Sequence, residues 1–297
     1  MFSLYFGHYL LNRGLITPDQ LTDALDLTES VYLKLGVLAV NAGYMTASRV
    51  GKVHQMQTKV DRMFGELAIE LGFLTKKQLD DLLSTQKQGH LLLGQALVDK
   101  DYLSLEQLQV ALDEYKKAYG LSEGQIYKLQ QGDVDEIVNT FVRIADSPEK
   151  ALYTFYISLM LRNVIRFIDN SPRVESSQIP EKLNAEWLVW QEITGSVNLF
   201  TAIAAEEPVF MDLARRYSGQ GLLEPDELAQ ASVAEFLNLH NGLFLVNMSN
   251  NGVELEMKPQ LIGQNKTVTG LGTGCIVPVY LRSGRFDVII SDSNPAL

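Results

Sequence analysis

A repeat with a constant period of 29 residues constrains the fold of this chain more than any other feature. An apolar residue followed by glycine recurs four times, and seven positions after each of these glycines comes a second marker. A period that is held through four copies predicts a module of structural repeats. The dipeptides are Phe6-Gly7, Leu35-Gly36, Phe64-Gly65 and Leu93-Gly94, and the second markers are Gly14, Gly43, Gly72 and Asp101.

Each copy is predicted to form two helices joined by a tight turn. Gly14 and its equivalents suit the left-handed residue just past the first helix. A hydroxyl side chain three residues further on suits the N-cap of the second helix. These hydroxyl residues are Thr17, Thr46, Thr75 and Ser104. Asp101 replaces the glycine in the last copy, so we expect a looser turn there.

The composition is that of an ordinary folded protein. It also argues against several kinds of partner, site and location. The length of 297 residues favours two domains. A formal charge of −11 argues against binding to a nucleic-acid backbone, because such binding depends on cations that neutralise phosphates. The single cysteine, Cys275, excludes an intrachain disulfide and a cysteine-based zinc site. The longest lipid-like run, residues 151 to 161, is shorter than the roughly 20 residues of a spanning helix, so we expect no membrane span and a cytoplasmic protein.

A change of character along the chain predicts three segments. Residues 1–117 form the helical repeat module, residues 118–148 a linker with a helix over 134–144, and residues 149–297 a second domain. The second domain is predicted to contain a helix over 151–168, a hairpin over 187–203, helices over 206–217 and 226–247, and strands over 253–257, 275–281 and 286–290. The fold class is therefore α+β: an all-α repeat module, followed by a domain with helices packed on an antiparallel sheet.

The helix predicted from residue 226 carries the sharpest sequence signal, a glutamate and an asparagine three residues apart. At this spacing Glu235 and Asn238 share one face of the helix. Ala231 and Gly242 continue the same face by one turn in each direction, so a polar pair is flanked by small residues. The backbone of another protein can approach such a surface closely. The opposite face is predicted to point into the core, and its residues are Val233, Leu237, His240 and Phe244.

Residues 149–297 resemble the CheC/CheX/FliY family of chemotaxis phosphatases, and the CheX type most closely. The resemblance rests on the hairpin 192–199, the helix start Glu206-Glu207-Pro208 and the helix segment 235–242. It implies that Asn238 orients the water that hydrolyses the phospho-aspartate of a CheY-like response regulator, while Glu235 pairs with the regulator's lysine. It also implies a homodimer, no cofactor of the chain's own, and a Mg²⁺ ion on the partner regulator.

Two departures from the family pattern leave a second function open. Ala231 stands where the family has aspartate or serine, and Ser232 follows one place late. The spacing from Asn238 to Pro259 is also shorter than in the family. The intact pair of Glu235 and Asn238 favours a phosphatase. The departures favour a non-enzymatic adaptor that binds a regulator without hydrolysing its phosphate.

The repeats resemble the N-terminal domain of the type II secretion and MSHA-pilus ATPases, in which a doubled motif binds cyclic di-GMP. That motif begins with arginine and ends with glutamine. The arginine position here holds Tyr5, Lys34, Met63 and Leu92. The resemblance implies a cyclic di-GMP site built on Lys34, Gln57 and Gln86. The alternative is a packing scaffold or a protein-docking module, because lysine lacks the forked guanidinium of arginine.

Overall fold

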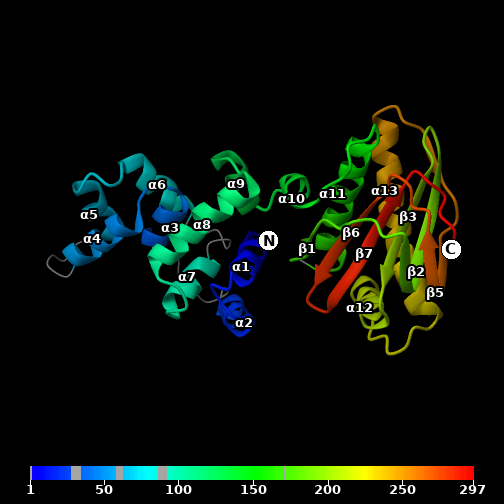
Figure 1. Cartoon of the computed structure of the whole chain (residues 1–297), viewed down its shortest axis with the longest axis horizontal. Coiled ribbons are helices and arrows are strands. Elements are labelled where there is room, and N and C mark those ends of the chain that lie inside the picture. The colour runs from blue at the N-terminus through cyan, green and yellow to red at the C-terminus, as the bar shows by residue number, and fades with distance from the viewer. Residues whose placement is uncertain (1, 28–34, 58–62, 86–91, 170) are drawn as a thin grey trace. The chain divides into compact units, whose positions relative to one another are not determined.

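The contacts within the chain divide it into two units, Met1–Gly132 and Asp133–Leu297 (Figure 1). The computed structural model describes residues 2–27, 35–57, 63–85, 92–169 and 171–297. The boundary between the units falls inside the predicted linker, residues 118–148. Helix α9 (Glu123–Gln130) belongs to the first unit and helix α10 (Val134–Phe141) to the second.

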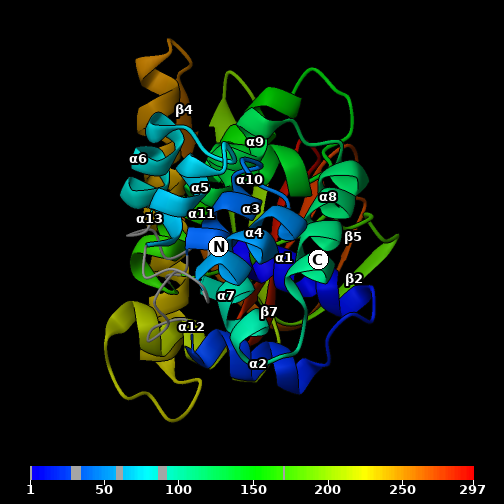
Figure 2. The ribbon, with the colours of Figure 1, turned by 90° about the vertical axis from the view of Figure 1, so that its left-hand side faces the viewer.

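The described residues of the first unit form helices and no strand (Figures 1 and 2). A pair of helices occupies each of the predicted hairpins. In the fourth hairpin, Ser104 is the N-cap of the second helix. Its hydroxyl accepts from the Gln107 N–H at 3.1 Å, and the Gln107 side chain accepts from the Ser104 N–H at 2.7 Å. The helices are α1 (Phe2–Asn12), α2 (Pro18–Leu27), α3 (Leu35–Asn41), α4 (Ala47–Gln57), α5 (Phe64–Glu70), α6 (Lys76–Thr85), α7 (Leu92–Asp99) and α8 (Leu105–Tyr119).

The same turn joins the two helices of every hairpin, including the fourth. The angle φ at the turn position is 67° at Gly14, 71° at Gly43, 67° at Gly72 and 56° at Asp101. The Asp101 N–H bonds to the Val98 carbonyl at 3.1 Å, as the Gly72 N–H bonds to the Ile69 carbonyl at 2.9 Å. The expectation of a looser fourth turn is therefore wrong. Aspartate enters the left-handed region more readily than most side chains, so it can replace glycine here.

The glycine of each first helix lets the second helix of the same hairpin approach closely. A Cβ atom placed on any of these glycines would come unusually close to one aliphatic side chain, fourteen residues further along the chain. The contacts are Gly7 with Leu21 at 2.6 Å, Gly36 with Val50 at 2.8 Å, Gly65 with Leu79 at 2.7 Å and Gly94 with Leu108 at 3.2 Å. The 29-residue period of the sequence is thus the period of one packing contact.

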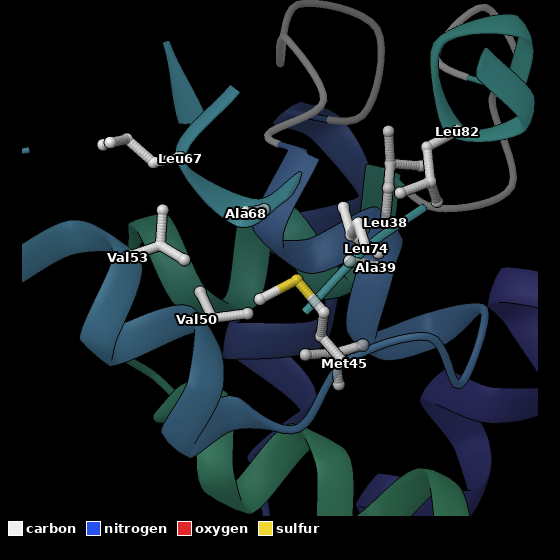
Figure 3. Close-up of a cluster of buried hydrophobic side chains, with 10 residues drawn as sticks. Leu38, Ala39, Met45, Val50, Val53, Leu67, Ala68, Leu74 and Leu82 are labelled. Carbon is white, nitrogen blue, oxygen red and sulfur yellow. The ribbon is translucent and has the colours of Figure 1, made fainter. Parts of the chain in front are cut away.

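The hairpins also pack on one another in pairs. Helix α2 packs against α7 of the fourth hairpin, and the Tyr102 hydroxyl donates to Asp23 Oδ2 at 2.6 Å between these two hairpins. Helix α4 packs against α5, and α3 against α6, so the second and third hairpins share a core (Figure 3). That core contains Leu38, Ala39, Val40, Met45, Val50, Val53, Leu67, Ala68, Leu74 and Leu82.

The second unit is α+β, which confirms the predicted fold class. Its helices are α10, α11 (Lys150–Phe167), α12 (Glu207–Ser218) and α13 (Glu227–Asn250). Its strands are β1 (Arg173–Val174), β2 (Lys182–Gly195), β3 (Leu199–Ala205), β4 (Leu255–Met257), β5 (Leu261–Thr269), β6 (Cys275–Leu281) and β7 (Gly284–Ser291). The strands pair antiparallel in the order β1-β6-β7-β3-β2-β4, and β5 also pairs with β2. Across the described residues of both units, no helix has the length and apolar character needed to cross a membrane.

Strands β1 and β5 are missing from the sequence prediction, and β2 is longer than predicted. Much of β5 is exposed and its side chains do not alternate between polar and apolar, so the local sequence gives no strand signal. Its pairing with residues 182–190 of β2 creates the strand. Strand β4 pairs with residues 193–195 of β2, so β4 and β5 lie end to end along β2 with Lys258, Pro259 and Gln260 between them.

Candidate functional site

Helix α13 holds the predicted pair Glu235 and Asn238 on its outward side. The helix begins at the N-cap Asp226, whose side chain accepts from the Ala229 N–H at 2.9 Å. The face that the sequence assigns to the core is fully buried: Val233, Leu237, His240 and Phe244 are 0 % exposed. Glu235 is consequently exposed and Asn238 is half-buried.

The two side chains contact each other, and Asn238 is also bonded to the sheet. Asn238 Nδ2 donates to Glu235 Oε2 at 3.3 Å, and Asn238 Oδ1 accepts from Gln191 Nε2 on β2 at 2.9 Å. Both polar atoms of the amide therefore have a partner that restrains the side chain. The Glu235 carboxylate is exposed at the surface, beside an asparagine that Gln191 of the sheet holds in position.

The small residues around the pair leave the helix surface open. Ala231 is exposed, and a Cβ atom on Gly242 would have only the Met257 side chain within reach, at 3.7 Å. Ser232, which follows Ala231, is buried, and its hydroxyl donates to the Leu228 carbonyl at 2.6 Å. The departure noted in the sequence is therefore also present in the structure, because Ser232 does not supply a polar group at the position of Ala231.

The break between β4 and β5 lies directly beside Gln191, the residue that bonds to Asn238. The Lys258 carbonyl accepts from Gln191 Nε2 at 2.8 Å, and the Lys258 N–H donates to the Glu192 carbonyl at 2.9 Å. Pro259 follows, and it has no N–H for a ladder bond, which is in keeping with the end of β4 at this point. Gln191 thus joins helix α13 to the gap between the edge strands β4 and β5.

A buried polar network behind Asn238 was not identified from the sequence. Asn241 Nδ2 donates to Gln191 Oε1 at 2.8 Å and to Thr201 Oγ1 at 2.9 Å. The Tyr156 hydroxyl donates to Asn241 Oδ1 at 2.8 Å. One sequence signal could have found Gln191: it alternates with Val189 and Ile193, so it is a polar residue in the apolar stripe of a strand.

His240 lies next to this network and is fully buried. Its Nδ1 lies 3.0 Å from Asn163 Nδ2, and its ring meets the Tyr156 ring edge to face with 4.4 Å between the centroids. Burial lowers the pKa of His240 to about 3. The imidazole is consequently neutral at physiological pH and serves as a packing group of the core.

The residues of the predicted cyclic di-GMP site lie at the edges of the described segments or outside them. Lys34 and Gln86 lie outside the described residues, and Gln57 is the last residue of α4, with a side chain that is not among those described. The nucleotide site therefore stays a prediction. Within the part of the chain that the structure covers, no group of three or more histidine, cysteine, aspartate or glutamate side chains is placed to hold a metal ion.

The chain is similar to known proteins in structure, whereas no match is found by sequence. No protein-family model and no curated protein matches the chain. A CheX chemotaxis protein from Desulfovibrio desulfuricans has a TM-score of 0.39 and 13 % identity, and the match covers 46 % of this chain and 94 % of that chain. A CheC-like chemotactic protein from Shewanella oneidensis has a TM-score of 0.40 and 18 % identity, covering 46 % and 94 % of the two chains.

A third similar structure contains a partner. It is the CheX–CheY–BeF₃–Mg²⁺ complex from Borrelia burgdorferi, with a TM-score of 0.39, 16 % identity, and coverage of 46 % of this chain and 94 % of that chain. All three similar structures are named as chemotaxis proteins. The resemblance of the repeats to the secretion ATPases stays a prediction.

Proposed function

We propose that the second unit hydrolyses the phospho-aspartate of a CheY-like response regulator. Asn238 orients the attacking water, and Glu235 pairs with the regulator's lysine. The observation that carries the proposal is the geometry of this pair on α13. An exposed carboxylate stands beside an amide that the sheet holds in place through Gln191.

The reaction needs an aligned water more than a nucleophile from the protein. The water oxygen attacks phosphorus, the bond between phosphorus and the aspartyl oxygen breaks, and the products are the free carboxylate, inorganic phosphate and one proton released to solvent. Because the transition state of phosphoryl transfer is loose, catalysis comes mainly from positioning and from charge stabilisation. The Mg²⁺ in this proposal belongs to the regulator, and Asn238 contributes the positioning.

The surroundings of the pair favour docking of another protein. Ala231 and Gly242 carry little or no side chain, so a partner backbone can approach α13 on both sides of the pair. Val246 lies one turn beyond Gly242 on α13, and Met257 of β4 lies beside Gly242; both are exposed apolar side chains. Apolar contacts there would add to the ion pair that Glu235 forms with a lysine.

The test is the decay of a phosphorylated CheY-like receiver with and without this protein. We expect the wild-type chain to speed the decay. Asn238→Ala should lower kcat by about 10²-fold, the usual effect of removing one preorganised polar group from an active site. Glu235→Ala should mainly raise KM for the receiver, because it removes a docking contact. Glu227→Ala is the matched control, an exposed glutamate two turns earlier on α13, and it should leave both constants unchanged.

A non-enzymatic adaptor is the second candidate function, and Ser232 is the observation that favours it. Its hydroxyl is bonded to its own helix, so the site has one polar group fewer than the family pattern. An adaptor would bind a receiver that carries beryllofluoride in place of the phosphoryl group and would leave the decay of the phosphorylated receiver unchanged. Binding without faster decay would thus replace the phosphatase with the adaptor.

The homodimer and the cytoplasmic location belong to the same proposal. The homodimer comes from the resemblance of residues 149–297 to the chemotaxis phosphatases, and the location comes from the short length of the longest lipid-like run in the sequence. Light scattering after size exclusion would measure the mass in solution, and a mass of one chain would contradict the dimer.

A further inference from the structure

We infer that Gln191 is a positioning residue that fixes the amide of Asn238 with its oxygen toward the sheet and its NH₂ group toward the partner. The group offered to a bound receiver is then a hydrogen-bond donor. This inference rests on the proposed function for its catalytic meaning, whereas the orientation of the amide follows from the contacts alone.

A backbone carbonyl sets the direction of the hydrogen bonds at the surface end of the network. The Lys258 carbonyl can only accept, so the Gln191 atom 2.8 Å from it must be the nitrogen Nε2. The same nitrogen lies 2.9 Å from the Asn238 side chain. A donor must face an acceptor, so the Asn238 atom at this position is Oδ1. The Nδ2 group then points away from the sheet, where it bonds to Glu235 Oε2 at 3.3 Å.

A second backbone carbonyl gives the same direction from the buried end. The Thr201 hydroxyl donates to the Gln191 backbone carbonyl at 2.7 Å, so its oxygen accepts from Asn241 Nδ2 at 2.9 Å. Asn241 Nδ2 also donates to Gln191 Oε1 at 2.8 Å, which leaves Asn241 Oδ1 to accept from the Tyr156 hydroxyl. These four residues are at most 1 % exposed. Reversing Gln191 would place its Nε2 against Asn241 Nδ2, and reversing Asn241 would place its Oδ1 against Gln191 Oε1. Either change leaves buried polar groups unpaired, which is costly.

This orientation decides how Asn238 can act on the water. A donated N–H holds one lone pair of the water oxygen and leaves the other lone pair for the phosphorus. The amide oxygen faces Gln191 and the sheet, so the NH₂ group and not the oxygen is the part of the amide that meets the water. The loose transition state requires little proton removal before the phosphorus–oxygen bond breaks, so a donor is sufficient.

Asn238→Asp separates a donor from an acceptor at this position. The carboxylate has the shape of the amide and still accepts from Gln191 Nε2, but it presents an oxygen to the partner. We expect kcat to fall by about 10²-fold, as for Asn238→Ala, because the donated hydrogen bond is lost in both. A kcat close to that of the wild type would overturn the inference.

Gln191→Met tests whether Gln191 acts through Asn238. Methionine has a similar volume and no donor, so we expect kcat to fall about tenfold or more through misplacement of the amide, while KM for the receiver changes little. In an Asn238→Ala background the same change should have no further effect on kcat. Equal losses in both backgrounds would mean that Gln191 supports the fold only. Val189→Ala, a buried change two residues away on β2, is the control and should lower the melting temperature without changing kcat.

A structural readout separates this inference from the proposed function. In the wild-type chain, a scalar coupling across the hydrogen bond should connect Gln191 Nε2 with the side-chain carbonyl carbon of Asn238. A coupling from Asn238 Nδ2 to the side-chain carbonyl carbon of Gln191 would overturn the inference even if the enzyme were active. If the wild-type chain speeds the decay of no receiver, the proposed function fails, and this coupling still decides the orientation of the amide.

Discussion

Tyr115 and Tyr156, which belong to different units, are both completely buried and differ in what their hydroxyl groups meet. Tyr115 on α8 packs among aromatic rings, with its ring centroid 5.1 Å from that of Tyr9 and 5.5 Å from that of Phe6. Its hydroxyl has no hydrogen-bond partner within the described residues. Tyr156 on α11 donates its hydroxyl to Asn241 instead. Burial raises the pKa of both hydroxyl groups well above the usual range of tyrosine.

The difference shows two ways of building a core. The core around Tyr115 is held by ring and aliphatic contacts, which tolerate a hydroxyl without a partner but gain nothing from it. The core around Tyr156 contains polar groups that satisfy one another, and the last of them is Asn238 at the surface. Such a network fixes the orientation of each member, because a reversed amide would leave buried groups unpaired.

Removing the centre of the polar network should have the largest effect. Asn241→Leu leaves the Tyr156 hydroxyl and Gln191 Oε1 without their partner, and we expect the free energy of unfolding of the second unit to fall by about 3 kcal/mol. Urea unfolding followed by tryptophan fluorescence measures this unit alone, because both tryptophans, Trp187 and Trp190, lie on β2.

Asn247→Leu on the same helix is the matched control for this change. The Asn247 side chain donates to the Leu243 carbonyl of its own helix and takes no part in the network. Its loss should cost less than about 1 kcal/mol. Equal costs for the two substitutions would show that the network contributes nothing of its own to stability.

Lowering the pH should reduce the free energy of unfolding of the second unit by slightly less than Asn241→Leu does. The folded pKa of His240 is about 3, whereas an unfolded histidine titrates near 6.5. Below pH 6.5 the unfolded chain binds a proton that the folded chain excludes, so stability is complete above that pH and falls as the pH is lowered toward 3. Between pH 7 and pH 5 the loss from this residue should be about 2 kcal/mol. His240→Phe keeps an aromatic ring and removes the titration, so the same dependence of unfolding on pH in variant and wild type would contradict this account.

The smallest expected effects come from removing the two tyrosine hydroxyl groups, and they test the comparison of the two cores directly. Tyr156→Phe should destabilise the second unit by about 1 kcal/mol, because Asn241 Oδ1 loses its donor. Tyr115→Phe should stabilise the first unit by up to about 1 kcal/mol, because it removes a buried hydroxyl that has no partner. Tryptophan fluorescence reports the first change, and hydrogen exchange of peptides from α8 reports the second. Changes of the same sign would mean that the two cores do not differ in the way described.

Much of the fold could be predicted because its signals are local. The glycine and the aliphatic residue fourteen positions later lie in one hairpin, so their period appears directly in the sequence. The fourth turn was predicted incorrectly because the rule used there concerns residue type, whereas hydrogen bonds of the neighbouring helix hold Asp101 in place. Strand β5 was missed because its existence depends on pairing with β2 and not on its own pattern.

By itself the sequence determined the repeat, the fold class, and the pairing of Glu235 with Asn238 on one helix face. The repeat and the fold class come from patterns along the chain. The pair comes from helical geometry, which fixes which neighbouring residues share a face. Only the tertiary structure decided that Gln191, 47 residues before Asn238, bonds to the Asn238 amide and sets the orientation of that amide. That contact depends on how β2, α13 and the gap between β4 and β5 pack together, and no spacing along the chain encodes it. The local pattern therefore gives the candidate residues, and the packed core gives their orientation.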